Sequence, residues 1–216
     1  MHSGTIPVIT IDGPSGSGKG TISQLLAKRL GWHYLDSGAV YRVLALMLCK
    51  KKIELRDISA IVTMANTLQK ELFFQEDIIA DIRSEECGAI ASEIATIPAV
   101  RSALIAFLHT FKRLPGLVAD GRDMGTVVFP QAQLKVFLTA TIAARAKRRL
   151  LQLQSGGITA TLSIVLQGLR ERDLRDEKRV IAPLKPAPTA VIIDTTKLNI
   201  DEILQMVLAH VNNMDF

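Results

Sequence analysis

The stretch Ile9–Thr21, which reads ITIDGPSGSGKGT, decides the fold of this chain. Apolar and β-branched residues from Val8 to Ile11 predict a buried strand, and the residues from Thr21 to Leu30 predict a helix. The glycines between them permit the positive φ angles and the close approach that a nest of backbone N–H groups around phosphate requires. The order strand, glycine loop, helix therefore predicts a phosphate-binding loop.

The spacing within this loop is that of G-x-x-x-x-G-K, with Gly13, Gly18 and Lys19 at the defining positions. The helix start adds its positive dipole end, and Lys19 adds a full charge. Gly20 stands where Ser or Thr usually follows, so the hydroxyl of Thr21 comes one residue late. A flexible Gly/Ser turn is the alternative, which the flanking strand and helix patterns disfavour. We expect the nucleotide to contact Gly13, Pro14, Ser15, Gly16, Ser17, Gly18, Lys19, Gly20 and Thr21.

The composition limits the classes of protein to which this chain could belong. With 216 residues, 48% of them hydrophobic, the chain is long enough for one packed domain. No stretch is apolar for the length of a membrane span, and residues 1–5 lack the pattern of a signal peptide, so we expect a cytoplasmic protein without a membrane partner. Cys49 and Cys87 lie too far apart in unlike contexts to indicate a disulfide framework or a metal quartet.

A net charge of +5 raises the alternative of nucleic-acid binding. The basic residues are dense between Arg145 and Arg179, however, where aromatic residues that would stack on bases are nearly absent. Such a cluster suits a small polyanion as well as it suits DNA or RNA.

Short apolar segments alternate with helical patterns along the chain. Strands are expected at Val8–Ile11, Trp32–Leu35, Leu117–Asp120, Leu134–Thr139 and Ala190–Asp194. Helices are expected at Thr21–Leu30, Val40–Lys50, Asp57–Gln69, Pro98–Arg113, Thr141–Gln154 and Thr161–Lys178, with further helices starting near Ser84 and Asn199. This alternation predicts an α/β fold, a parallel five-stranded sheet of the P-loop NTPase type flanked by helices.

Polar residues follow the ends of three expected strands. Asp12 precedes the phosphate loop, Asp36 and Ser37 end the second strand, and Asp120-Gly121-Arg122-Asp123 ends the third. Each Asp could instead cap the next helix. Because ligands collect at the carboxyl ends of parallel strands, three such clusters at one sheet edge favour a binding site.

Two arginines stand beside these clusters. Arg42 comes one short helical turn after Ser37, and Arg122 lies on the loop after a buried strand. Together with Lys19 they predict a second phosphate beside the one in the loop. The alternative is a surface ion pair of either arginine with Asp36 or Asp123.

Two further sets of charges fall on helix faces. Arg145, Arg148 and Arg149 stand at i, i+3 and i+4, just before Gly156-Gly157. Like charges stacked in this way repel, so something anionic should compensate them, and we expect a lid over triphosphate at about residues 145–160. The second set is Arg172, Arg175, Asp176 and Arg179, for which spacing alone favours an ordinary Arg172 to Asp176 salt bridge.

A phosphate loop, a second anion pocket and an arginine lid together indicate phosphoryl transfer between two nucleotides. Such catalysis is mostly positioning and cation placement, with Mg²⁺ bridging the donor phosphates. The expected metal contacts are Thr21 and Asp120, directly or through water. The expected catalytic residues are Lys19, Arg122, Arg145, Arg148 and Arg149.

Four runs of this sequence resemble bacterial cytidylate kinases: Ile11–Gly16, Leu35–Arg42, Ala119–Gly125 and Ala182-Pro183-Leu184. The resemblance covers almost the whole chain, and the second and third runs separate this family from adenylate, guanylate and thymidylate kinases. It implies transfer of the terminal phosphate of ATP to CMP or dCMP. Nucleoside monophosphate kinases also resemble one another in the Gly-Lys-Gly-Thr ending of the loop.

The resemblance implies a role for nine acceptor-binding residues. Ser37, Arg42 and Arg122 would hold the acceptor phosphate, and Arg172, Asp176 and Arg179 would grip the sugar, which replaces the salt-bridge interpretation. The residues that would read the cytosine edge are Ser92, Arg101 and Asp123. Without the comparison, Ser92 and Arg101 are indistinguishable from ordinary helix residues.

The expected organisation is one kinase domain over residues 1–216. Its core covers about 1–37 and 114–216, and an acceptor-binding region covers about 38–113. An inserted hairpin near 71–83 is shorter than in the family. We expect a monomer that binds ATP and CMP or dCMP and no nucleic acid. A P-loop nucleotide switch or a basic nucleic-acid-binding ATPase is the alternative from a different class.

Overall fold

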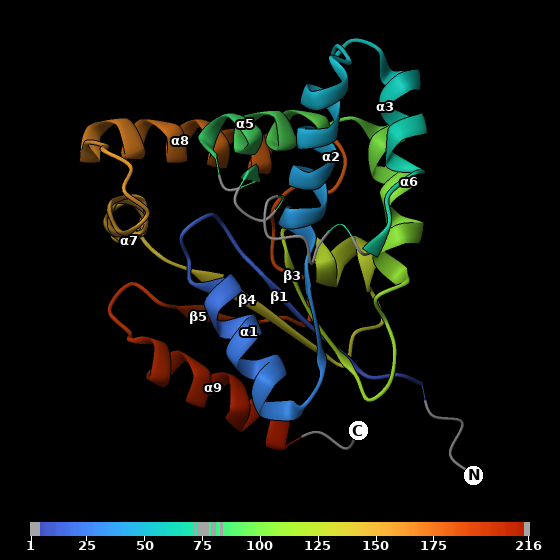
Figure 1. The fold of residues 1–216 in the computed structure, drawn as a ribbon. Coiled ribbons are helices and arrows are strands. Elements are labelled where there is room, and N and C mark those ends of the chain that lie inside the picture. The colour runs from blue at the N-terminus through green and yellow to red at the C-terminus, as the bar shows by residue number, and fades with distance from the viewer. Residues whose placement is uncertain (1–4, 71, 73–77, 79–80, 83, 214–216) are drawn as a thin grey trace. The chain divides into compact units, whose positions relative to one another are not determined.

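The computed structural model describes residues 5–70, 72, 78, 81–82 and 84–213 (Figure 1). The chain divides into two compact units. The first unit joins Met1–Tyr34 to Lys112–Phe216, and the second unit is the continuous segment Leu35–Phe111. The phosphate loop therefore belongs to the first unit.

A five-stranded sheet in the order β2-β3-β1-β4-β5 forms the frame of the protein. β1 pairs in parallel with β3 and β4, and β4 pairs in parallel with β5. The predicted α/β fold with a parallel sheet of the P-loop type is confirmed. The strands are β1 Val8–Asp12, β2 His33–Asp36, β3 Leu117–Gly121, β4 Leu134–Thr139 and β5 Val191–Asp194.

The pairing of β1 with β3 determines what lies at the carboxyl end of the sheet. Asp12 at the end of β1 stands opposite Gly121 at the end of β3. The phosphate loop follows Asp12, and Arg122 and Asp123 follow Gly121. The sheet therefore brings two of the three predicted polar clusters to one edge.

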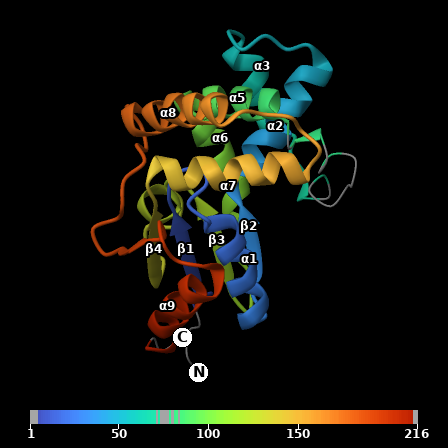
Figure 2. The same cartoon turned by 90° about the vertical axis from the view of Figure 1, so that its left-hand side faces the viewer.

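Five helical segments accompany the strands in the described part of the first unit. α1 and α9 lie side by side against the sheet (Figure 2), where the buried Leu26 and Val207 join a core with strand residues such as Ile11 and Val136. α7 and α8 pack on each other around Ala146 and Leu169, so they form a smaller core of their own. The segments are α1 Lys19–Leu30, the π-helix η2 Met124–Val128, α7 Ile142–Ser155, α8 Leu162–Lys178 and α9 Ile200–Asn212.

Side chains that the sequence marks as caps start these helices. The Thr141 hydroxyl accepts a hydrogen bond from the Ala144 N–H at the start of α7. Asn199 forms a capping box with Glu202 at the start of α9, with distances of 2.9 and 2.8 Å. Gly31 ends α1 with a φ of 66°, which only glycine adopts without strain. These boundaries follow from local chemistry, which is why the sequence predicts them.

In its described residues, the second unit is mainly helical beyond the end of β2. α2 packs against α5 and α3, and α3 also packs against α6. The buried Leu44, Ile61, Ile94 and Leu104, one from each helix, show that each of these helices turns an apolar face inward. The helices are α2 Ser37–Lys51, α3 Ile58–Ala65, α5 Glu85–Ile94 and α6 Pro98–His109.

Some boundaries differ from those expected. α2 begins at Ser37 instead of Val40 because Asp36 caps it, its carboxylate accepting from the Ala39 N–H at 2.9 Å. α3 ends at Ala65 instead of Gln69, and the turns after it bond three residues back, as Thr67 does to Met64. α6 ends at His109 instead of Arg113 for the same reason.

The predicted inserted hairpin at 71–83 lies mostly outside the described residues and stays a prediction. Within that range, the described Ile82 N–H donates to the Ile78 carbonyl at 3.0 Å, which is a helical contact. In the part of the chain that is described, no single helix is long and apolar enough to span a membrane. The pair Glu86–Ile94 and Pro98–His109 passes that test together but is bent by 100°.

Replacing Gly13 with Ala tests the space at the start of the loop. Gly13 has a φ of 153°, and an added Cβ would lie 2.1 Å from the Leu138 carbonyl oxygen. We expect a loss in the free energy of unfolding of about 3 kcal/mol or more, measured by urea denaturation. The control is Gly168→Ala in the middle of α8, where nothing lies within 4 Å of the added atom. That control should gain about 0.5–1 kcal/mol, and a Gly13→Ala protein as stable as the wild type would contradict the described loop.

Candidate functional site

Glycine conformations give the phosphate loop its shape. Gly13, Gly16 and Gly18 all have positive φ, at 153°, 78° and 95°. Gly18 is also the N-cap of α1, with its carbonyl accepting from the Ile22 N–H at 3.1 Å. The loop thus passes directly into the helix N-terminus, where backbone N–H groups and the helix dipole favour an anion.

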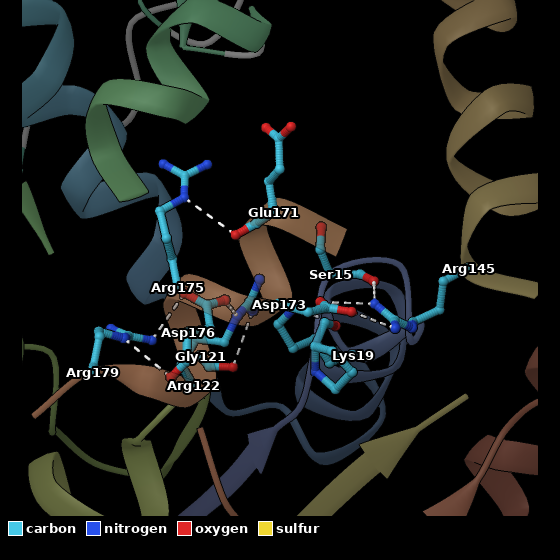
Figure 3. Close-up of polar contacts among 11 residues, drawn as sticks. Ser15, Lys19, Gly121, Arg122, Arg145, Glu171, Asp173, Arg175, Asp176 and Arg179 are labelled. Atoms are coloured by element: carbon cyan, nitrogen blue, oxygen red, sulfur yellow. Dashed lines mark hydrogen bonds and ion pairs between the residues drawn. The ribbon is translucent and has the colours of Figure 1, made fainter. Parts of the chain in front are cut away.

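Arg145 on α7 is anchored by the protein itself. Its guanidinium forms a bidentate ion pair with Asp173 of α8, with N–O distances of 3.0 and 2.6 Å (Figure 3). It also donates to the carbonyls of Ser15 at 3.2 Å and Ala140 at 3.0 Å. The anion expected to compensate this arginine is therefore Asp173, a residue that the sequence did not single out.

Arg148 also reaches the phosphate loop. Its Nη1 donates to the Thr195 hydroxyl at 3.0 Å and lies 3.5 Å from the Gly16 carbonyl, while Nη2 donates to the Thr195 carbonyl. Arg149 is half-buried on the same helix. Two of the three predicted lid arginines thus contact loop carbonyls, and a movement of residues 145–160 as a lid stays a prediction.

Asp120 at the end of β3 lies beside the start of α1. Its carboxylate accepts from the Tyr34 hydroxyl at 2.6 Å, and an atom added as Cβ at Gly20 would lie 3.5 Å from it. Asp120 is buried, whereas Thr21 is exposed on the first turn of α1. Among the described residues, no group of three or more His, Cys, Asp or Glu could hold a metal alone. One carboxylate next to a phosphate loop suits Mg²⁺, which proteins usually hold together with substrate phosphates and water.

Asp12 joins the end of β1 to η2. Its carboxylate accepts from the Met124 N–H at 2.9 Å and the Gly125 N–H at 2.8 Å. Burial raises the pKa of Asp12 to about 6, against the lowering effect of these two hydrogen bonds. This contact fixes the backbone that directly follows Arg122 and Asp123.

Arg122, Asp176 and Arg179 form a charge cluster in which Asp176 and Arg179 are buried and Arg122 is half-buried. The Asp176 carboxylate accepts from the Arg122 Nε at 2.7 Å and from the Arg179 Nη2 at 3.1 Å (Figure 3). Burial alone would raise the pKa of Asp176, but the charges of Arg122 and Arg179 outweigh it and hold the pKa below its usual value. Two guanidinium groups against one carboxylate leave the cluster positive, so it is suited to an anion.

Asp176 contacts more than one arginine, and this changes how the charges of the cluster are interpreted. Asp176 bridges Arg122 and Arg179, and the nearby Arg172 also lowers its pKa. The alternative in which Arg122 pairs with Asp123 at the surface does not describe its contact, because Arg122 pairs with Asp176. Asp123 itself is buried at the N-cap of η2. The structure thus brings together three of the predicted acceptor-binding residues.

In the second unit, Ser37 and Arg42 lie on the first turns of α2. Ser37 is buried. The Arg42 Nη1 donates to the carbonyls of Ile82 at 2.7 Å and Ser84 at 3.1 Å. These contacts hold the guanidinium against the start of α5, where an added Cβ at Gly88 would lie 2.7 Å from it.

Ser92 and Arg101 are both buried, with 7% and 3% of their surface exposed. The Ser92 hydroxyl has no hydrogen-bond partner among the described residues, and the Arg101 Nη1 donates to the Ala95 carbonyl at 3.2 Å. Leaving a buried polar group unsatisfied is costly, so such a group in a native protein often meets a ligand. Burial is the signal that sequence patterns could not supply for these two residues.

The fold and the loop define the class of protein: a P-loop nucleotide-binding protein with a parallel sheet and an adjoining charge cluster. The likeness in fold extends to the crystal structure of an uncharacterized protein from Eubacterium ventriosum. That structure matches with a TM-score of 0.52 and 10% identity over 96% of this chain and 99% of the other.

Comparison of sequences narrows the class. The family model described as Cytidylate kinase matches residues 9–213. A cytidylate kinase from Aeromonas hydrophila is 50% identical over 214 residues, covering 94% of this chain and 93% of the relative. One from Stutzerimonas stutzeri is 48% identical over 222 residues, covering 97% of each. The chain belongs to the cytidylate kinase family, which confirms the resemblance seen in its four sequence runs.

Replacing Asp176 with Asn tests the charge cluster. We expect the free energy of unfolding at pH 7 to fall by about 3 kcal/mol, since the change leaves two guanidinium groups without their carboxylate. Because the folded pKa is lowered, the stabilisation by Asp176 is present above its unfolded pKa of about 4 and is lost as pH falls further. Urea denaturation over a pH series measures both effects.

The matched control is Asp81→Asn. Asp81 pairs with Lys50 at 3.2 Å with both side chains about half exposed, so its loss should cost less than about 0.5 kcal/mol. Equal stability of the two variants at pH 7 would contradict the structural importance of the Asp176 cluster.

Proposed function

We propose that this chain transfers the γ-phosphate of ATP to CMP or dCMP, giving ADP and CDP or dCDP. The observation that carries the proposal is membership of the cytidylate kinase family over residues 9–213. The site adds chemical support, because a phosphate loop and a positive cluster at the end of β3 occur in one unit. Phosphoryl transfer needs both a donor cradle and cations for the acceptor.

ATP is the donor in this proposal and occupies the loop Gly13–Thr21. Backbone N–H groups of the loop and of the first turn of α1 bind its phosphates, and Lys19 neutralises the charge that develops on the transferred group. Mg²⁺, when bound with ATP, would neutralise charge on the donor phosphates. Asp120, whose carboxylate accepts from the Tyr34 hydroxyl, would hold it in this proposal, and Thr21 is the further expected contact.

The acceptor phosphate binds Arg122 in this proposal. Opening of the Arg122 to Asp176 contact would free the guanidinium for phosphate and the carboxylate for a sugar hydroxyl. Arg179 stays beside Asp176 and offsets its charge, and Arg172 contributes a further positive charge. Asp123, fixed next to the Asp12 contact, reads the cytosine edge.

The second unit by itself carries four of the expected acceptor-binding residues. Arg42 and Ser37 bind the acceptor phosphate from the start of α2, where the helix dipole also favours an anion. Ser92 and Arg101 bind the base, which would give the buried Ser92 hydroxyl a partner. We assign Leu35–Phe111 as the acceptor-binding unit on these grounds.

No general base is required for this reaction, because the attacking acceptor oxygen is already ionised at pH 7. The arginines Arg122, Arg145, Arg148 and Arg149 are the proposed electrostatic contributors, acting on phosphate directly or by holding the loop. The proposed species is a cytoplasmic monomer that needs only small nucleotides.

A panel of nucleoside monophosphates tests the function. With Mg²⁺ and ATP, we expect CMP and dCMP to be phosphorylated with kcat/KM at least about a hundredfold above AMP, GMP and UMP, because buried polar contacts reject a base that cannot satisfy them. Separation of the products by ion-exchange chromatography measures each transfer directly. Preference for another monophosphate would contradict the proposal, as would ATP hydrolysis that RNA or DNA stimulates without transfer to CMP.

Lys19→Ala is the control in this assay. It removes the loop cation while the backbone of the loop remains, so its rate should fall by about a hundredfold or more. An equal rate in the purified variant would show that the transfer came from a contaminating kinase.

A further inference from the structure

Four consecutive carbonyl groups of the phosphate loop, those of residues 14–17, each lie within hydrogen-bond distance of a side chain. The Lys19 Nζ lies 3.4 Å from the Pro14 oxygen, and the Thr195 hydroxyl donates to the Ser17 oxygen at 3.0 Å. Arg145 donates to the Ser15 oxygen at 3.2 Å, and Arg148 lies 3.5 Å from the Gly16 oxygen. Side chains of the protein therefore hold the loop through its carbonyl groups.

The orientation of these carbonyls determines where the N–H groups point. In a trans peptide the C=O and N–H bonds point in opposite directions. Carbonyls held by side chains of the protein therefore direct the N–H groups of Ser15, Gly16 and Gly18 away from those side chains, whereas the Ser17 N–H closes a turn to Pro14 at 3.4 Å. N–H groups directed to one side are what an anion-binding nest requires.

Asp173 and Thr195 hold the two arginines whose guanidinium groups contact the loop. Asp173 fixes the Arg145 guanidinium through the bidentate ion pair, at 3.0 and 2.6 Å. Thr195 is fully buried, and its hydroxyl accepts from Arg148 while sharing its one proton between the carbonyls of Ser17 and Thr139, at 3.0 and 3.1 Å. The hydroxyl therefore links Arg148 to the Ser17 carbonyl of the loop and to the Thr139 carbonyl at the end of β4.

We propose that Thr195 and Asp173 are positioning residues for ATP, which fix the peptide orientations of the phosphate loop without touching the nucleotide. Thr195 acts on the Ser17 carbonyl directly and on the Gly16 carbonyl through Arg148. Asp173 acts on the Ser15 carbonyl through Arg145. This inference rests on the proposed function only in taking ATP as the ligand of the loop.

Thr195→Val tests the inference, because valine keeps the shape of the side chain and removes the hydroxyl. We expect the Kd for ATP, measured by equilibrium titration without CMP, to rise about tenfold, together with the KM for ATP. The KM for CMP should stay within about twofold of the wild type. Thr195→Ser restores the hydroxyl and should recover most of the ATP affinity. The matched control is Thr63→Val on α3, whose hydroxyl bonds only within its own helix, and which should leave both constants unchanged.

Asp173→Asn provides a second test by weakening the ion pair at constant size, and a severalfold rise in the Kd for ATP is expected. If urea denaturation shows that Thr195→Val fails to fold, the ATP affinity of Asp173→Asn alone tests the inference. Wild-type ATP affinity in the folded variants, or equal losses for ATP and CMP, would overturn the inference. If the wild type binds ATP but transfers nothing to CMP, the proposed function fails, while the ATP titrations still decide the role of Thr195 and Asp173.

Discussion

The hydrogen-bonding requirement of the phosphate loop is the constraint on which the rest of the site depends. In a loop whose N–H groups bind phosphate, the carbonyl groups need other partners. Here side chains donate hydrogen bonds to these carbonyls. Space is equally limited: Gly13 faces the Leu138 carbonyl, and an added Cβ at Gly16 would lie 3.0 Å from Arg145. The sheet and α7 therefore fix the loop from two sides.

Helix α8 supplies the carboxylates that pair with Arg145 beside the loop and with the two arginines of the charge cluster. Asp173 pairs with Arg145, and Asp176, three residues later, pairs with Arg122 and Arg179. One helix thus serves both the donor loop and the charge cluster assigned to the acceptor. Asp12 adds a second link, because its carboxylate ties the strand before the loop to the backbone after Asp123.

Local patterns in the sequence predict much of the fold. The strand, loop and helix around Gly13–Thr21 follow from glycine spacing and apolar periodicity, and the caps Thr141 and Asn199 mark helix starts through their side-chain chemistry. Each of these signals lies within a few residues of the structure that it specifies. The π-helix Met124–Val128 has no such signal, because the distant Asp12 accepts its N–H groups.

The partners within the site are harder to predict, since they are far apart in the sequence. Arg145 and Ser15 are 130 residues apart, and Tyr34 and Asp120 are 86 residues apart. Spacing placed Arg145 and Arg148 on one helix face, but it could not identify Asp173 or Thr195 as their partners. Ser92 and Arg101 were identified as candidate site residues only through the family resemblance, because their burial depends on packing that no local pattern encodes.

The proposed reaction requires one chain to bind a donor and an acceptor nucleotide at the same time, through separate sets of residues. A single inhibitor with adenosine and cytidine joined by five phosphates tests this claim most directly. Steady-state inhibition against varied ATP and varied CMP is the measurement. The account predicts competition with both substrates and an affinity beyond that of either alone, because one molecule fills both sites. Competition with ATP alone, at the affinity of ATP, would contradict it.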